Sequence, residues 1–217
     1  LLFQITHSGR KGTGGTVHTA LYPEGAPAGA RLLSEDEVER IRDRFVKAAS
    51  LAEAAGTDGI DFKLCHGYFG AELLRPANDR KDRWGGSFEN RTRFLRGSVP
   101  EIRSALRRRD FILGARLSLY EGIRGGCGTA AADELVEDLS EMRRVVSLMA
   151  ELGMEYVNVS AGIPGDTSEI TRPVPQGRWF YLHHIRYARV VSEALAAARK
   201  AGAAGSPAVI QSALSIL

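Results

Sequence analysis

Apolar residues fall into two alternating patterns along this chain: short continuous runs, and longer stretches in which they recur every three or four positions. The short runs predict buried strands at residues 1–6, 59–65, 111–119, 156–160 and 208–212. The longer stretches predict helices at residues 34–56, from residue 87 onward, at 132–152 and at 181–201. Strict alternation of strand and helix indicates right-handed crossovers and a parallel sheet covered by helices.

Local signals place several helix ends. Ser34 and Glu37 have the spacing of a capping box, which predicts that the first helix begins after Ser34, and Gly56 marks its end. A second helix is expected to start at Ser87, and Pro100 must kink or restart it because proline cannot donate a helical hydrogen bond. His183 and His184, near the start of the last helix, are expected at the surface or at the rim of a site.

Two α/β architectures share this alternation. A doubly wound sheet usually carries Gly-x-Gly-x-x-Gly after its first strand, and this fingerprint is missing. A (β/α)8 TIM barrel has eight strands and typically ~250 residues, so five strands would form part of one. Both ends of the chain read as strands that are cut part-way. We therefore expect residues 1–217 to form a partial TIM-barrel domain, truncated at both ends.

Composition and charge narrow the function classes. With 44% hydrophobic and 25% charged residues, the chain is typical of a soluble globular protein, and no stretch approaches the ~18 apolar residues of a membrane span. The net charge is only +3 and the basic residues are scattered, which argues against a nucleic-acid partner. Cys65 and Cys127 have neither metal-ligand nor disulfide spacing, which fits a reducing cytoplasm.

From these features we expect a cytoplasmic protein with no signal peptide, no metal site and no membrane contact. Its partner is expected to be a small-molecule substrate. A homo-oligomer is an open alternative to a monomer.

Candidate chemistry is expected where the strands end, because barrel active sites lie at the C-terminal face. Side chains alternate along a strand, so Asp61, Lys63 and Cys65 share the interior face of the second strand. Lysine is rare in this sequence, and a lysine aimed into a barrel requires a ligand or a counter-charge. An ion pair with Asp61 and a functional role for Lys63 are equally open at this point.

Three further residues lie at neighbouring strand ends. Arg116 has small or apolar neighbours, and a buried guanidinium requires a planar acceptor such as a carboxylate, a phosphate or a cofactor carbonyl. His66 and Tyr68, each taken alone, would more often be a packed histidine and a core aromatic. Several such groups at adjacent strand ends favour a functional site.

Five blocks of sequence stand out, in order along the chain. They are Gln4-Ile5-Thr6-His7-Ser8-Gly9-Arg10, the stretch from Asp58-Gly59-Ile60-Asp61 to His66-Gly67-Tyr68, Asp82-Arg83-Trp84-Gly85-Gly86-Ser87-Phe88-Glu89-Asn90-Arg91-Thr92-Arg93-Phe94, Gly114-Ala115-Arg116-Leu117-Ser118, and residues 156–162. The first resembles the pattern Q-x-x-H-x-G-R of the Old Yellow Enzyme family of FMN-dependent oxidoreductases. The third is close to that family's D-x-[YW]-G-G-S-x-E-N-R-x-R-F signature, which is highly specific.

The resemblance implies an eight-stranded β/α barrel with FMN at its C-terminal mouth. This chain would cover strands three to seven, and the rest of strand seven and strand eight, which bind the FMN phosphate in the family, would follow Leu217. Gln4 matches the family glutamine that hydrogen-bonds the flavin pyrimidine, and Arg116 matches the arginine beside flavin N1 and the C2 carbonyl. Tyr68 matches the tyrosine that protonates the substrate α-carbon. His66 matches the second member of a His/Asn or His/His pair that grips the substrate carbonyl oxygen or a phenolate.

Lys63 departs from the family pattern, because it stands where the first histidine of that pair usually sits. An ammonium donates to a developing enolate oxygen, but it is not a neutral imidazole donor and its geometry is less fixed. The hypothesis therefore keeps Lys63 as a carbonyl clamp. A Schiff-base role is less favoured, because the flavin would fill the space it needs. Residues 85–91 are expected to form a turn, a helix cap and structural polar contacts.

Three functions follow from this interpretation. The first is an FMN-dependent NAD(P)H oxidoreductase that passes hydride from reduced flavin to an activated alkene such as an enone. The second is a flavin-dependent dehydrogenase or demethylase of the branch that carries an iron–sulfur cluster. The third is a barrel fragment that binds no cofactor and has no activity.

Overall fold

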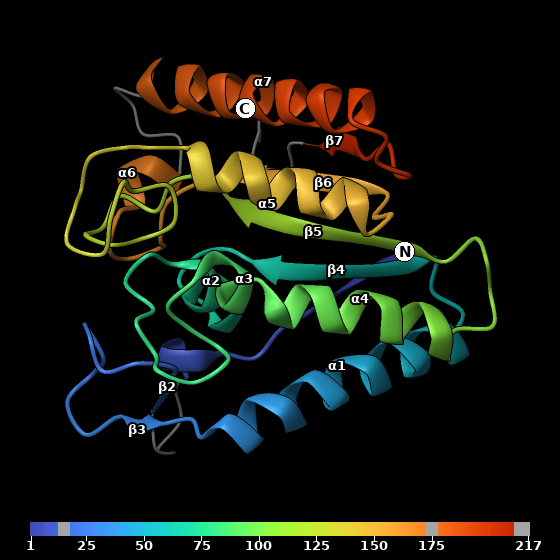
Figure 1. Cartoon of the computed structure of the whole chain (residues 1–217), viewed down its shortest axis with the longest axis horizontal. Coiled ribbons are helices and arrows are strands. Elements are labelled where there is room, and N and C mark those ends of the chain that lie inside the picture. The colour runs from blue at the N-terminus through green and yellow to red at the C-terminus, as the bar shows by residue number, and fades with distance from the viewer. Residues whose placement is uncertain (13–17, 172–177, 211–217) are drawn as a thin grey trace.

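The protein is described by a computed structural model that places residues 1–12, 18–171 and 178–210 (Figure 1). Within these residues, five strands form one sheet in the order β1-β4-β5-β6-β7, and every pairing between neighbours is parallel. The strands are β1 (Leu2–Ile5), β4 (Gly59–Leu64), β5 (Ile112–Ser118), β6 (Tyr156–Ser160) and β7 (Ala208–Ile210). This order repeats the chain order, which confirms the predicted parallel sheet.

Four long helices connect the strands of the described sheet. They are α1 (Glu35–Ala54), α4 (Arg93–Ala105), α5 (Ser140–Glu151) and α7 (Arg178–Lys200). Helix α1 packs against α4, and α5 packs against α7. Figure 1 shows these helices running along the strands, from α1 at the bottom of the view to α7 at the top. The arrangement is that of a β/α barrel in which, within the described residues, the sheet is open.

Short elements gather beyond the carboxyl ends of the strands, on the left of Figure 1. They are η1 (Gly9–Lys11), α2 (Phe69–Leu74), α3 (Phe88–Arg91), α6 (Ser168–Thr171) and the paired strands β2 (Thr19–Ala20) and β3 (Arg31–Leu32). Loops that carry function on such a scaffold are expected at this edge.

The hydrophobic core lies between the sheet and the helices. Ile60, Phe62 and Leu64 of β4 are buried on this side, as the alternation of side chains predicts. Phe45 of α1 packs against Phe62 and against Phe94 of α4, with ring centroids 5.8 Å and 5.1 Å apart. The opposite face of β4, with Asp61 and Lys63, is therefore the barrel interior.

The predicted capping box at the start of α1 is present. The Glu37 amide donates to the Ser34 hydroxyl, and the Glu37 carboxylate accepts from the Ser34 amide. Ser87 caps α3 in a similar way by accepting from the Asn90 amide. Pro100 does not restart a helix, since α4 runs through it. The break between α3 and α4 lies at Thr92 instead.

The prediction of a helix over residues 132–152 is wrong at its start, because α5 begins only at Ser140. Glu137 forms a bridge with Thr129, and its carboxylate accepts from the Tyr187 hydroxyl at 2.7 Å. These contacts hold the segment before Ser140 in a non-helical loop. His184 also differs from expectation: it is buried, with its Nε2 atom 3.1 Å from the Ile170 carbonyl oxygen.

Strands β1 and β7 form the two edges of the described sheet, where Phe3 and Ile210 are exposed. Residues 211 and 212, the predicted continuation of the last strand, lie outside the described residues. Across the described ranges, no helix has the length and apolar character needed to cross a membrane.

Candidate active site at the carboxyl ends of the strands

Strand register arranges the interior side chains in two rows. Gln4, Asp61, Gly114 and Tyr156 are aligned on β1, β4, β5 and β6 in the lower row. The second row lies two positions nearer the carboxyl ends of the strands. There Lys63 is aligned with Arg116, and Arg116 is aligned with Asn158. The candidate residues that the sequence placed on separate strands are thus neighbours on one surface.

Arg116 projects from β5 into this interior with an incomplete set of partners. Its Nε atom is buried and makes no hydrogen bond. A buried donor without an acceptor is destabilising, and a guanidinium favours planar acceptors. The site therefore offers an acceptor-binding position beside Arg116.

Lys63 does not form the ion pair with Asp61 that was one of its two open interpretations. Its Nζ atom lies over the Tyr68 ring, 3.1 Å from the centroid, in a cation–π contact. Asp61 instead accepts a hydrogen bond from Gln4 Nε2 at 2.6 Å. The ammonium of Lys63 and the ring of Tyr68 therefore face the same part of the interior.

His66 sits in a strained turn after β4. Its φ angle is 61°, in the left-handed region that side chains other than glycine rarely adopt. The His66 amide donates to Ser118 Oγ at 3.2 Å, and the imidazole Nε2 lies 2.7 Å from Ser160 Oγ. Hydroxyls at the ends of β5 and β6 thus fix both the backbone and the ring of His66.

The electrostatic surroundings keep the His66 ring neutral near pH 7. Burial, together with the nearby cations Arg116 and Lys63, lowers the pKa of His66 to about 4. A neutral imidazole has one donor and one acceptor nitrogen. With Nε2 engaged by Ser160, the other ring nitrogen, Nδ1, is the one left to face a ligand.

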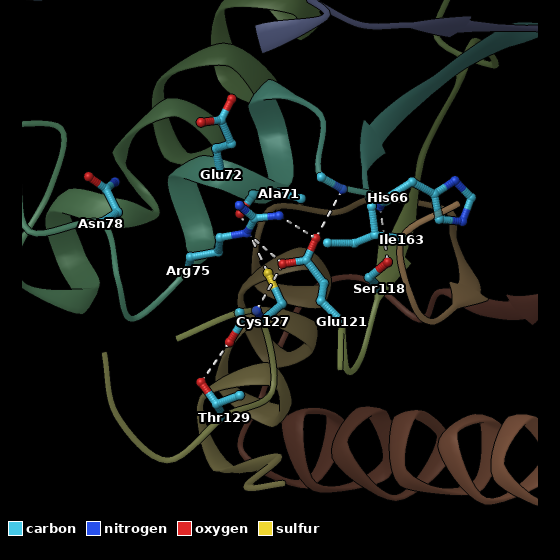
Figure 2. A network of polar contacts seen from close by, with 12 residues as sticks. His66, Ala71, Glu72, Arg75, Asn78, Ser118, Glu121, Cys127, Thr129 and Ile163 are labelled. Carbon is cyan, nitrogen blue, oxygen red and sulfur yellow. Dashed lines mark hydrogen bonds and ion pairs between the residues drawn. The ribbon is translucent and has the colours of Figure 1, made fainter. Parts of the chain in front are cut away.

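A buried ion pair lies beside the turn at His66 and contacts the backbone of the next residue, Gly67 (Figure 2). Arg75 Nε donates to Glu121 Oε2 at 2.6 Å, and both side chains are at most 3% exposed. Glu121 also accepts from the backbone amides of Gly67 and Cys127, each at 3.0 Å. Burial acts to raise the pKa of Glu121, but Arg75 and these hydrogen bonds outweigh it and lower the pKa overall.

The sequence assigned no role to several residues that shape the site, although Ser160 was among the residues at the predicted strand ends. Ser160, Glu121 and Tyr156 act through contacts with residues far away in the chain, which strand patterns do not reveal. Glu121 gave one signal, as an acidic residue two positions after the apolar run 111–119, at the start of a glycine-rich loop. The structure brings Gln4, Lys63, His66, Tyr68 and Arg116 together at the ends of β1, β4 and β5.

Comparison with known proteins assigns this arrangement to a family. The sequence model of the NADH:flavin oxidoreductase / NADH oxidase family matches residues 11–166. The chain belongs to this family. The family match confirms the resemblance to the Old Yellow Enzymes and the partial barrel that was inferred from it.

Flavin oxidoreductases from several organisms are similar in sequence. The NADH oxidase of Thermoanaerobacter brockii is 32% identical over 171 residues, which are 75% of this chain and 25% of that protein. The NADPH dehydrogenase of Clostridium acetobutylicum is 35% identical over 167 residues, 75% of this chain and 46% of that protein. The chain thus spans a quarter to just under half of the length of these relatives.

Solved structures share the fold of this flavin oxidoreductase chain. A 2-naphthoyl-CoA reductase in complex with 2-naphthoyl-CoA superposes with a TM-score of 0.67 at 23% identity, covering 95% of this chain and 31% of that one. The Old Yellow Enzyme homologue from Zymomonas mobilis gives a TM-score of 0.60 at 24% identity, over 74% of this chain and 47% of that one. At these identities the structures support the fold alone.

Proposed function

We propose that this chain contributes strands three to seven of an FMN-dependent barrel enzyme that uses NAD(P)H to reduce an activated alkene such as an enone. Membership in the flavin oxidoreductase family supports the cofactor. The names of the relatives, an NADH oxidase and an NADPH dehydrogenase, support a nicotinamide as reductant. The observation that carries the proposal is the buried Arg116 Nε, which has no acceptor on the face shared with Gln4.

The interior surface fits a flavin ring. Arg116 supplies an unpaired donor and a fixed positive charge, which suit the flavin N1 and C2 carbonyl. Gln4, on the far side of Asp61, supplies an amide for the pyrimidine edge. FMN bound there would supply hydride transfer, and the Arg116 charge would favour the anionic reduced form by compensating its negative charge.

The substrate would lie against Lys63, His66 and Tyr68. Lys63 Nζ and a His66 ring nitrogen donate to the carbonyl oxygen and stabilise the negative charge that develops on it. The Tyr68 hydroxyl gives its proton to the α-carbon while the β-carbon receives hydride, so the alkene gains the two hydrogens of a reduction. The contact between Lys63 Nζ and the Tyr68 ring supports this assignment, because it keeps the two side chains adjacent.

The cofactor half of this proposal is tested by reconstitution. The full-length protein should bind FMN, show flavin absorbance, and lose that absorbance on anaerobic addition of NAD(P)H. Arg116→Met should weaken FMN binding by about tenfold or more, since a hydrogen bond to a charged group contributes roughly 1.5–3 kcal/mol. Arg189→Met, which changes an exposed arginine of α7, is the matched control and should bind FMN normally. A full-length protein that binds no FMN would contradict the proposal. An FMN affinity of Arg116→Met equal to that of the wild type would show that Arg116 does not contact the cofactor.

A further inference from the structure

Gln4 and Asp61 are hydrogen-bonded partners on adjacent strands of the barrel interior. They are aligned in the register of β1 and β4, and Gln4 Nε2 donates to Asp61 Oδ2 at 2.6 Å. An ionised carboxylate only accepts hydrogen bonds, so the nitrogen end of the Gln4 amide must face Asp61. The oxygen end, Oε1, is then directed away from Asp61, and it accepts no hydrogen bond from any residue the structure describes.

Tyr156 of β6 approaches the Asp61 carboxylate, whose Oδ1 atom is buried without a hydrogen bond to any described residue. Its hydroxyl interacts with Asp61, which is only 7% exposed. To reach Asp61, the Tyr156 ring crosses Gly114 of β5, where an added Cβ would lie 2.1 Å from a ring carbon. The glycine is therefore required by the contact, and the position of Asp61 depends on three neighbouring strands.

Asp61 also lies close to Arg116, the other residue proposed to contact the flavin. The Arg116 charge stabilises the Asp61 carboxylate, although burial raises the pKa of Asp61 overall. The polar groups beside the carboxylate are the Gln4 amide, the Tyr156 hydroxyl and the Arg116 backbone amide, and all three can donate to it. Asp61 is thus close to both residues proposed to contact the flavin, Gln4 and Arg116.

We propose that Asp61 is a positioning residue for the flavin: it fixes the Gln4 side chain so that the amide oxygen, and not the amide nitrogen, is presented to the cofactor. This inference rests on the proposed function. The group recognised by an amide oxygen is a donor, and the flavin pyrimidine has one donor, the N3–H. Asp61 therefore selects a flavin with a free N3–H through Gln4.

The test measures dissociation constants of the full-length apoprotein for FMN and for 3-methyl-FMN, in which the N3–H is replaced. The wild-type protein should bind 3-methyl-FMN roughly threefold to fifteenfold more weakly than FMN, the range of one net hydrogen bond. Gln4→Leu should bind the two flavins with nearly equal affinity. This arm needs no change at Asp61, so equal binding of the two flavins by the wild-type protein overturns the proposal even where an Asp61 variant fails to fold.

The second arm changes Asp61 itself. Asp61→Asn lets the Gln4 amide turn either way, so FMN affinity should fall by a similar factor and the preference over 3-methyl-FMN should shrink. In the Gln4→Leu background the same change should alter FMN affinity less than twofold. Asp110→Asn, which removes an exposed carboxylate before β5, is the matched control and should leave both constants unchanged.

The outcomes separate this proposal from the proposed function. Wild-type protein that binds FMN and 3-methyl-FMN equally overturns the positioning role of Asp61 and leaves the flavin enzyme in place. An Asp61 effect that is equally large with and without Gln4 also overturns it, because Asp61 would then not act through Gln4. Wild-type protein that binds neither flavin overturns both.

Discussion

The Nε2 atom of His66 lies 2.7 Å from the Oγ atom of Ser160, so a residue at the end of β6 orients a side chain that follows β4. The two residues are 94 positions apart in the sequence. A serine hydroxyl can donate to Nε2 or accept from it, so this contact fixes the orientation of the His66 ring in either tautomer. Ser160 is thus a positioning residue for the proposed carbonyl clamp.

Replacing Ser160 by alanine should weaken ligand binding without affecting the cofactor. The His66 ring would lose the contact that fixes its orientation, and affinity for a phenol or an enone should fall roughly threefold to tenfold, as expected for one hydrogen bond. The measurement is a titration of flavin absorbance with each ligand. Ser147→Ala on α5, away from the sheet interior, serves as the control. Unchanged phenol affinity in Ser160→Ala would contradict the role.

The lowered pKa of His66 predicts an acid-dependent loss of stability in the apoprotein. The pKa of this side chain is about 4 in the folded protein, against 6.5 for an unperturbed histidine, so the unfolded chain takes up this proton first as pH falls. His66 therefore causes no loss above about pH 6.5, a growing loss between about 6.5 and 4, and no further loss below. The total is at most about 3 kcal/mol.

This pH dependence is measured by urea unfolding of the wild type and of His66→Gln at several pH values. The free energy of unfolding should fall less steeply in the variant between pH 6.5 and 4. Parallel curves would show that His66 titrates normally in the folded protein.

The buried ion pair of Arg75 and Glu121 predicts a large loss of stability when one partner is removed. Arg75→Met leaves the Glu121 carboxylate buried without its counter-charge, and the free energy of unfolding should fall by about 3–5 kcal/mol. Lys81→Met, in an exposed pair with Asp79, should change it by less than about 1 kcal/mol. A loss in Arg75→Met no larger than in this control would contradict the account of the ion pair.

Substitution by alanine is expected to have opposite effects on stability at Gly114 and at Gly97. Gly114→Ala places a methyl group against the Tyr156 ring and should destabilise the protein by about 1–3 kcal/mol. Gly97→Ala, inside α4, meets only the flexible end of Arg42 and should stabilise it by roughly 0.5–1 kcal/mol. Thermal unfolding of both variants checks the pair, and a neutral Gly114→Ala would show that the Tyr156 ring does not need this space.

Much of the fold could be predicted because its strands and helix ends follow from short local sequence patterns. β6 spans the same residues as its apolar run, and α1 begins after the capping serine, Ser34. The prediction failed where distant residues decide the conformation. The stretch at 132–139 has helical spacing, yet Glu137 is held out of a helix by Tyr187 of α7. Pro100 likewise fits inside α4, while the break comes at Thr92.

The candidate site shows the same division. Alternation along β4 placed Lys63 on the interior face, and the structure agrees. The alternation could not predict the partner of Lys63. Asp61 is hydrogen-bonded to Gln4, 57 positions away, and Lys63 contacts Tyr68 instead. Register between strands, which the sequence does not contain, selects these partners.

The most direct test of the central claim is single-turnover reoxidation of the reduced full-length enzyme by an enone. Tyr68→Phe should slow this reoxidation by about a hundredfold or more, because the α-carbon loses its proton donor. Lys63→Met should also slow it, and Lys81→Met, at an exposed lysine, should not. Reoxidation by ferricyanide, which needs no proton donor, should proceed at the wild-type rate in all three variants. Wild-type rates with the enone in both Tyr68→Phe and Lys63→Met would contradict the proposed site.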